Sequence, residues 1–278
     1  MEFIQITNDP QFALECELAG IQRIMVDLEV LGKRERQRGR DTVLSDHAIS
    51  DIASVRSRLN SATLMVRINP WGEWSRGEVD QAVDAGADVI MLPMVRDVHQ
   101  TEELCDAVDG RARTCLLLET ASAVARLDGI IGSGGMDEAF VGLNDLHLEM
   151  KVDFMFELVS GGLIEWIGNC VQSKGMRFGF GGVSTDEREP ISGEEILGEH
   201  VRIGSSMVIL SRGFAAQAGA EGVGNRPIRL ASQMDVLRGS LDRWRSAEAS
   251  DLESNHATFS SAVAMVVNRV RHSGVELG

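Results

Sequence analysis

The sequence has little positive charge and no long apolar run, and these two absences exclude broad classes of function. Its 278 residues include 27 Lys and Arg against 42 Asp and Glu, a formal net charge of −15. Such an acidic chain would repel the phosphates of nucleic acid and the anionic face of a membrane. No stretch approaches the roughly 20 apolar residues of a membrane-spanning helix. We therefore expect neither nucleic acid nor a membrane as a partner.

Paired cysteines and a secretion signal are also missing. The four cysteines, at positions 16, 105, 115 and 170, show no CxxC spacing. The first ten residues have neither a basic start nor an apolar run before a small-residue cleavage site. We expect a cytoplasmic protein with reduced, mostly buried thiols.

Short runs of aliphatic and β-branched residues alternate with segments of helical periodicity. The eight candidate strands are 3–7, 23–29, 63–69, 88–94, 114–120, 139–144, 177–183 and 206–211. Helical spacing of apolar residues marks 10–19, 49–59, 77–85, 98–108 and 154–170. Strands that alternate with helices pair in parallel, and eight such units favour a (β/α)8 TIM barrel of about 250 residues. A doubly wound sheet is the alternative fold, but no strand is followed by GxGxxG.

The chain changes character after residue 212. Residues 213–225 are rich in Gly and Ala, and we expect them to form a linker to two helices over 230–247 and 251–271. This gives a barrel domain over 1–213 and a C-terminal helical extension over 214–278. The second helix carries an apolar stripe of Phe259, Val263, Val266, Val267 and Val270. The stripe packs either on its own barrel or, through a flexible linker, on a neighbouring subunit. We expect a homo-oligomer, a trimer or a hexamer.

Polar residues interrupt several strands at their last positions, where the loops of a parallel barrel converge on one mouth. Side chains alternate along a strand, so those two positions apart share a face. The polar residues at strand ends are Asp27 and Glu29, Arg67 and Asn69, Glu119, and Asp145. If they face inward together, several carboxylates crowd around one guanidinium.

Such a group needs a further positive charge, which a hard divalent cation supplies. We predict a Mg²⁺ or Mn²⁺ site, with Co²⁺ as a third candidate, held by Glu119 and Asp145. Two carboxylates leave coordination positions for a bidentate 2-oxo acid and water. Each acid also has a structural explanation: Asp27 would cap a helix or pair with Lys33 or Arg34, Glu119 would pair with Arg67, and Asp145 would begin a turn together with Asn144.

Five short elements, in order along the chain, resemble the HpcH/HpaI aldolases together with the citrate lyase β-subunit group. They are Asp-Leu-Glu at 27–29, Val-Arg-Ile-Asn-Pro at 66–70, Gly-Ala-Asp-Val-Ile-Met-Leu-Pro-Met at 86–94, Leu-Glu-Thr at 118–120 and Gly-Leu-Asn-Asp-Leu at 142–146. The likeness covers roughly three quarters of the chain. It implies a barrel of the pyruvate/phosphoenolpyruvate superfamily, a divalent metal, and reversible cleavage or formation of a carbon–carbon bond through an enolate.

The resemblance also implies roles for individual residues. Glu119 and Asp145 would hold the metal, while the backbone N–H groups of Asn144 and Asp145 would receive the substrate carboxylate. Arg67 would bind the 2-oxo oxygen, where negative charge builds up. Of the remaining matched positions, Pro93 would contact substrate, and Asp27 and Glu29 would orient metal-bound water.

One position departs from the family pattern. In the aldolase branch a histidine follows the glutamate of the second strand, and in the citrate lyase branch an aspartate does; here the residue is Val30. The general base is therefore open between His47, His147 and a metal-bound water. A basic cluster follows, and it either recognises an anionic co-substrate or is a solvated loop. The cluster comprises Lys33, Arg34, Arg36, Arg38 and Arg40.

These observations favour a divalent-metal-dependent carbon–carbon lyase of the class II aldolase type, which makes or breaks a 2-oxo acid through a pyruvate enolate with an aldehyde co-substrate. A CoA-ester lyase or citrate-type condensing enzyme shares the enolate but presents a thioester. A non-catalytic metabolite-binding barrel that has lost its base is the alternative from another class.

Overall fold

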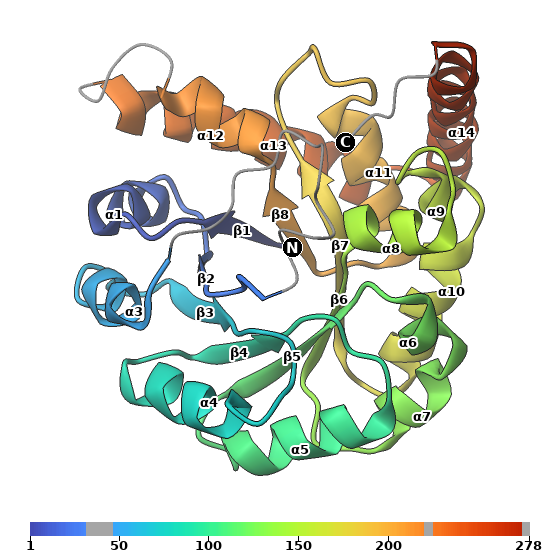
Figure 1. Ribbon diagram of the computed structural model, residues 1–278. Helices are drawn as coiled ribbons and strands as arrows, with labels where there is room; N and C mark the ends of the chain where they lie inside the picture. Colours follow the sequence, from blue (N-terminus) through green and yellow to red (C-terminus); the bar gives the residue numbers. More distant parts are fainter. Residues whose placement is uncertain (32–46, 220–224, 274–278) are drawn as a thin grey trace.

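Eight parallel strands close into a barrel in which each strand pairs with the next in sequence and the last pairs with the first. The computed structural model describes residues 1–31, 47–219 and 225–273. The strands are β1 (Glu2–Ile6), β2 (Arg23–Asp27), β3 (Thr63–Arg67), β4 (Val89–Leu92), β5 (Arg113–Leu118), β6 (Glu138–Val141), β7 (Arg177–Val183) and β8 (Met207–Leu210). All eight predicted strands are present, and the (β/α)8 barrel is confirmed (Figure 1).

Helices surround the barrel on its outside (Figure 1). They are α1 (Pro10–Leu18), α3 (Ile49–Arg56), α4 (Ser75–Asp84), α5 (Val98–Val108), α6 (Ala121–Ala125), α7 (Leu127–Gly132), α8 (Leu143–Met150), α9 (Glu157–Ser160), α10 (Leu163–Ser173), α11 (Gly193–Ile203), α12 (Arg212–Gly219), α13 (Arg226–Arg245) and α14 (Ala249–Ser273). The helix predicted over 154–170 is divided into α9 and α10, because Gly162 between them adopts a left-handed φ of 80°. In the described residues, no helix is long and apolar enough to cross a membrane.

The barrel interior is filled with side chains, several of them methionines. The inner cluster consists of Ile4, Met25, Met65, Val89, Met91, Cys115, Leu117, Phe140 and Met207, each at most 2% exposed. A second, larger core lies between the outside of the strands and the helices. Because the interior is packed, a substrate site belongs at an end of the barrel.

The expected linker over 213–225 is wrong for residues 213–219, which belong to helix α12. Alanine has the highest intrinsic helix propensity, and three of the eight residues of α12 are alanine. Phe214, fully buried, anchors the helix to the core. The boundary expected between residues 213 and 214 falls inside this helix.

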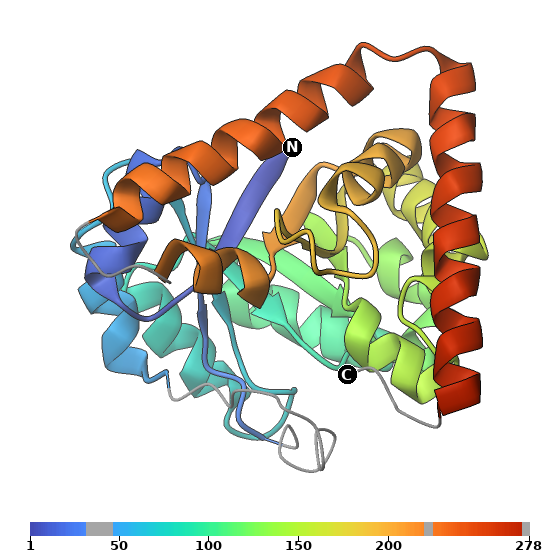
Figure 2. The ribbon, with the colours of Figure 1, turned by 90° about the horizontal axis from the view of Figure 1, so that it is seen from above.

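The C-terminal helices lie against the chain's own barrel. Helix α13 packs on α1, α11 and α12, and α14 packs on α9 and α11; Figure 2 shows both as long rods along the outside of the molecule. On the apolar stripe of α14, Phe259 is 0% exposed and Val263 is 2% exposed. The Phe259 ring meets Phe156 edge to face with centroids 5.7 Å apart. The stripe is therefore covered within the chain, the first of the two alternatives.

A buried ion cluster closes the amino-terminal end of the barrel. Arg23 and Glu138 are each 0% exposed, and the Arg23 guanidinium donates to both Glu138 carboxylate oxygens. Arg113 and Arg177 each donate to Oε1 of Glu138 at 3.1 Å. The Glu138 carboxylate thus accepts hydrogen bonds from three guanidinium groups, two from the adjacent strands β5 and β7 and one from β2 across the barrel.

Removing that carboxylate charge is expected to destabilise the protein strongly. Glu138→Gln leaves Arg23 underpaired in the interior, and loss of one buried partner costs about 3–5 kcal/mol. Burial alone would raise the pKa of Glu138, but the guanidinium groups, Arg23 first, hold it below its ordinary value of 4.5. The carboxylate therefore stabilises the fold above about pH 4.5, and the difference between wild type and variant shrinks as the pH falls further. Urea unfolding at pH 7 and pH 4 measures both effects. Asp80→Asn, which breaks an exposed pair with Arg111, is the control and should cost less than about 1 kcal/mol.

Candidate active site

Four strands place side chains above the packed interior, because the direction of the side chains alternates along each strand. The inward-facing core residues Met25, Met65, Met91 and Leu117 lie near the carboxyl ends of β2 to β5. The residues two positions later are Asp27, Arg67, Pro93 and Glu119. Because side chains two positions apart share a face, these four point toward the same mouth.

Arg67 and Asp27 form a bidentate ion pair across β2 and β3. Nε and Nη2 of Arg67 donate to the two carboxylate oxygens of Asp27 at 2.8 and 2.7 Å. A carboxylate oxygen of Glu29 lies 3.6 Å from Nε. Burial alone would lower the pKa of Arg67, but Asp27 and then Glu29 raise it, so the guanidinium stays charged. The fork geometry fixes its plane, as lysine would not.

Glu119 is the buried acid of the mouth, with 2% of its surface exposed. The backbone N–H of Met94 donates to its Oε1 at 2.9 Å. Burial, together with the negative charges of Asp145 and Glu29, raises the pKa of Glu119 to about 8, and Arg67 opposes this shift. The charges of Asp145, Glu29 and Arg67 therefore all act on the Glu119 carboxyl.

Helix α8 begins at this mouth directly after β6. Gly142 is its N-cap, and Leu143, Asn144 and Asp145 form the first turn. The first N–H groups of a helix have no carbonyl one turn earlier to bond, and they carry the positive end of the helix dipole. Asn144 and Asp145 are half-buried, and N–H groups at the start of a helix suit an anion; their predicted role in binding the substrate carboxylate stays a prediction.

Gly142 leaves room for the Glu119 carboxylate because it has no side chain. A Cβ added at Gly142 would lie 2.6 Å from Oε2 of Glu119, although its φ of −80° suits any residue. Gly142→Ala is therefore expected to displace the Glu119 carboxylate with the fold intact, and a cation held by Glu119 would then bind about tenfold or more weakly. Isothermal titration with Mn²⁺ measures this. Gly77→Ala is the control, because nothing lies within 4 Å of its added Cβ; equal affinity of the two variants would contradict the expectation.

The two candidate histidines lie in different surroundings. His47 is half-buried, and its Nδ1 accepts the backbone N–H of Asp27 at 2.9 Å. With Nδ1 occupied as an acceptor, the proton of neutral His47 belongs on Nε2, which makes that atom a donor. His147 is 3% exposed, and its Nδ1 lies 3.1 Å from the Leu143 carbonyl of its own helix. His47 therefore contacts the backbone of Asp27 at the mouth, whereas His147 is a buried residue within α8.

Met94 was not singled out from the sequence. It follows the predicted Pro93, which is buried, and adopts a φ of 55° that non-glycine residues rarely hold. In this conformation the backbone N–H of Met94 donates a hydrogen bond to Glu119. The sequence signal was limited to its place at the end of an apolar strand. The basic cluster of 33–40 lies outside the described residues.

Among residues 1–31, 47–219 and 225–273, no three His, Cys, Asp or Glu side chains are grouped to hold a metal.

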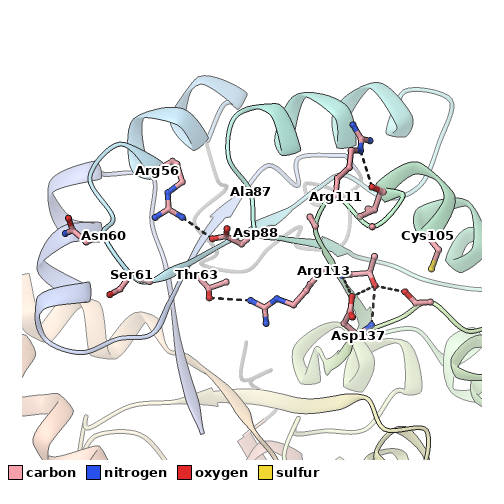
Figure 3. A pocket seen from close by; sticks show the side chains of 16 residues that line it. Arg56, Asn60, Ser61, Thr63, Ala87, Asp88, Cys105, Arg111, Arg113 and Asp137 are labelled. Atoms are coloured by element: carbon pink, nitrogen blue, oxygen red, sulfur yellow. Dashed lines mark hydrogen bonds and ion pairs between the residues drawn. The ribbon is translucent and has the colours of Figure 1, made fainter.

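A cavity of about 770 Å³ lies at the other end of the barrel, among the loops that enter β3, β4 and β5 (Figure 3). Its cations already have partners: Arg56 pairs with Asp88 at 3.0 Å and Arg113 donates to Thr63 at 3.4 Å. This end of such barrels serves stability. The cavity is therefore separate from the site at the mouth.

Comparisons with known proteins agree on one family. The family model for HpcH/HpaI aldolase/citrate lyase matches residues 3–155. A hydroxypyruvate/pyruvate aldolase of Roseobacter denitrificans is 28% identical over 160 residues, which span 44% of this chain and 59% of that protein.

Solved structures show the same fold at low sequence identity. An HpcH/HpaI aldolase/citrate lyase family protein of Burkholderia cenocepacia J2315 has a TM-score of 0.62 at 13% identity, covering 79% of this chain and 92% of that one. Protein CitE of Mycobacterium tuberculosis, solved with magnesium and pyruvate, has a TM-score of 0.60 at 15% identity, covering 93% of this chain and 97% of that one.

Proposed function

The chain belongs to the HpcH/HpaI aldolase/citrate lyase family, and we propose that it is a divalent-metal-dependent lyase that cleaves or forms a 2-oxo acid through a pyruvate enolate, with an aldehyde as the second partner. The observation that carries this proposal is the buried Glu119 at the same mouth as the Arg67 guanidinium, which Asp27 holds in a fixed plane. The aldolase of Roseobacter and the magnesium- and pyruvate-bound CitE support the substrate class.

Glu119 and Asp145 would hold the cation. Burial and the charges of Asp145 and Glu29 raise the pKa of Glu119 to about 8, so a nearby positive charge would favour its ionised form. Mg²⁺ or Mn²⁺, with Co²⁺ as a third candidate, matches such oxygen ligands. When bound, the cation supplies Lewis-acid stabilisation of an enolate oxygen.

The substrate carboxylate would bind at the start of α8, to the N–H groups of Asn144 and Asp145. Pro93, buried at the end of β4, would contact the carbon skeleton. Arg67 uses Nε and Nη2 for Asp27, which leaves Nη1 to donate to the 2-oxo oxygen. These contacts would place the carbonyl of a 2-oxo acid between Arg67 and Glu119.

In the cleavage direction, the C4 hydroxyl would give its proton to a water molecule oriented at the site, and the bond between C3 and C4 breaks. The electron pair of that bond forms the C2–C3 double bond and the carbonyl pair moves to the C2 oxygen, which gives an aldehyde and an enolate. The water then returns the proton to C3 to give pyruvate. Arg67 would stabilise the enolate charge as it forms. Asp27 would hold Arg67 and, with Glu29, orient water at the site. His47 would donate from Nε2 to the oxygen of the aldehyde fragment.

The test is a screen with metal-stripped and reloaded protein. We expect deuterium exchange at C3 of pyruvate by NMR, and aldol products from pyruvate or hydroxypyruvate with a panel of aldehydes, both lost with a chelator and restored by Mg²⁺, Mn²⁺ or Co²⁺. Undiminished turnover after chelation would overturn metal dependence. Binding of pyruvate without any exchange would indicate a non-catalytic barrel, and turnover of a CoA thioester alone would indicate a different lyase.

A further inference from the structure

Asn69 links the ends of β2 and β3 through its side chain. It lies two residues after β3 and is 9% exposed. Its Oδ1 accepts the backbone N–H groups of Val30 and Leu31 at 3.0 and 3.1 Å. Both lone pairs of the amide oxygen are thus used to hold the chain just after Glu29.

Glu78 of helix α4 holds Asn69 from the other side. The backbone N–H of Asn69 donates to Oε2 at 3.0 Å, and Nδ2 donates to Oε1 at 2.7 Å. Both oxygens of a half-buried carboxylate are therefore directed at one residue. Since donors face Oδ1 and an acceptor faces Nδ2, the orientation of the amide is fixed by its partners.

Apolar packing does little to hold the segment that Asn69 binds. Val30 is 48% exposed and Leu31 is 43% exposed, whereas the preceding Glu29 is 2% exposed. The N–H of Glu29 itself donates to Oδ1 of Asp27 at 3.1 Å. Three consecutive N–H groups are thus bound by side chains of the mouth, so hydrogen bonds decide where the chain turns after Glu29.

We propose that Asn69 and Glu78 are positioning residues that set this turn and thereby hold the Glu29 carboxylate beside Arg67, an inference that rests on the proposed function of the mouth. Neither side chain needs to touch substrate. Glu29 lies 3.6 Å from Nε of Arg67 and adds to the negative field at Glu119, so its displacement would change the charge at the reacting centre.

Exchanging the amide and the acid tests this. In Asn69→Asp, the new carboxylate of residue 69 faces the carboxylate of Glu78. In Glu78→Gln, the new side-chain NH₂ of residue 78 faces one of the two N–H donors of Asn69. The double variant Asn69→Asp/Glu78→Gln restores a complementary donor and acceptor at every contact. We expect each single variant to speed amide exchange of Val30 and Leu31 about tenfold, shift the Arg67 Nε–H resonance and lower kcat about tenfold. The double variant should recover all three. Glu73→Gln, exposed on the same connection, is the control.

A second measurement separates positioning from mere stability. In the Glu29→Gln background, Glu78→Gln should lower kcat no further, because the group it positions is already gone. Unchanged amide exchange in the single variants, an unmoved Arg67 resonance, or fully additive losses of kcat would overturn the proposal. If the wild type catalyses no carbon–carbon chemistry, the proposed function fails, while the exchange rates and the Arg67 resonance still decide whether the pair positions Glu29.

Discussion

Arg67→Lys is expected to lower kcat by about two orders of magnitude while leaving the protein folded. The variant keeps a positive charge but loses the planar fork that binds both oxygens of Asp27 at 2.8 and 2.7 Å. One point charge cannot meet Asp27 and an enolate oxygen in the same fixed geometry. Loss of one preorganised donor at developing negative charge typically costs about 10²–10³ in kcat. Steady-state cleavage kinetics with saturating metal measure it.

Arg67→Ala should have a larger effect on both activity and stability. It leaves Asp27 and Glu29 buried at 3% and 2% exposure without their guanidinium, which costs about 3–5 kcal/mol when one partner of a buried pair is removed. The matched control for Arg67→Lys is Arg56→Lys, which lies at the other end of the barrel in a half-exposed pair with Asp88. Retention of kcat within about threefold in Arg67→Lys would contradict a role of Arg67 in stabilising the enolate.

The fold could be predicted because its signal is repeated. Eight apolar runs separated by helical segments are consistent only with a small set of architectures, and the observed strands lie within one residue of the predicted starts. The errors have local causes. Glycine at 162 adopts a left-handed conformation and divides one predicted helix, whereas the alanines of α12 favour helix despite the glycines beside them.

The site was predictable as a set of strand-end residues but not as a network. Alternation places Asp27, Arg67 and Glu119 on one face, yet it does not choose which acid pairs with Arg67; the structure pairs it with Asp27. The bond from His47 to the Asp27 backbone and the positive φ of Met94 depend on tertiary contacts. No local pattern encodes them, since both result from how loops meet after folding.

Glu119→Gln is expected to abolish metal-dependent activity and yet stabilise the metal-free protein. The pKa of Glu119, raised to about 8 by burial and by Asp145 and Glu29, lies above its ordinary value of 4.5. The native state therefore binds a proton that the unfolded chain releases, and stability falls as the pH rises from about 4.5 to about 8. Glutamine removes this penalty. In a chelator, the variant should exceed the wild type by about 4 kcal/mol at pH 8 and match it below pH 4.5.

Adding the cation should reverse that order. A ligand that binds only the native state stabilises it by mass action, so Mg²⁺ or Mn²⁺ at pH 8 should raise the unfolding midpoint of the wild type and leave Glu119→Gln unchanged. Glu187→Gln, which replaces an exposed acid, should follow the wild type throughout. Equal stabilisation of all three proteins by the cation would place the metal elsewhere. A crossing of the two stability curves would instead mean that the carboxylates at this mouth oppose folding until a dication binds between them.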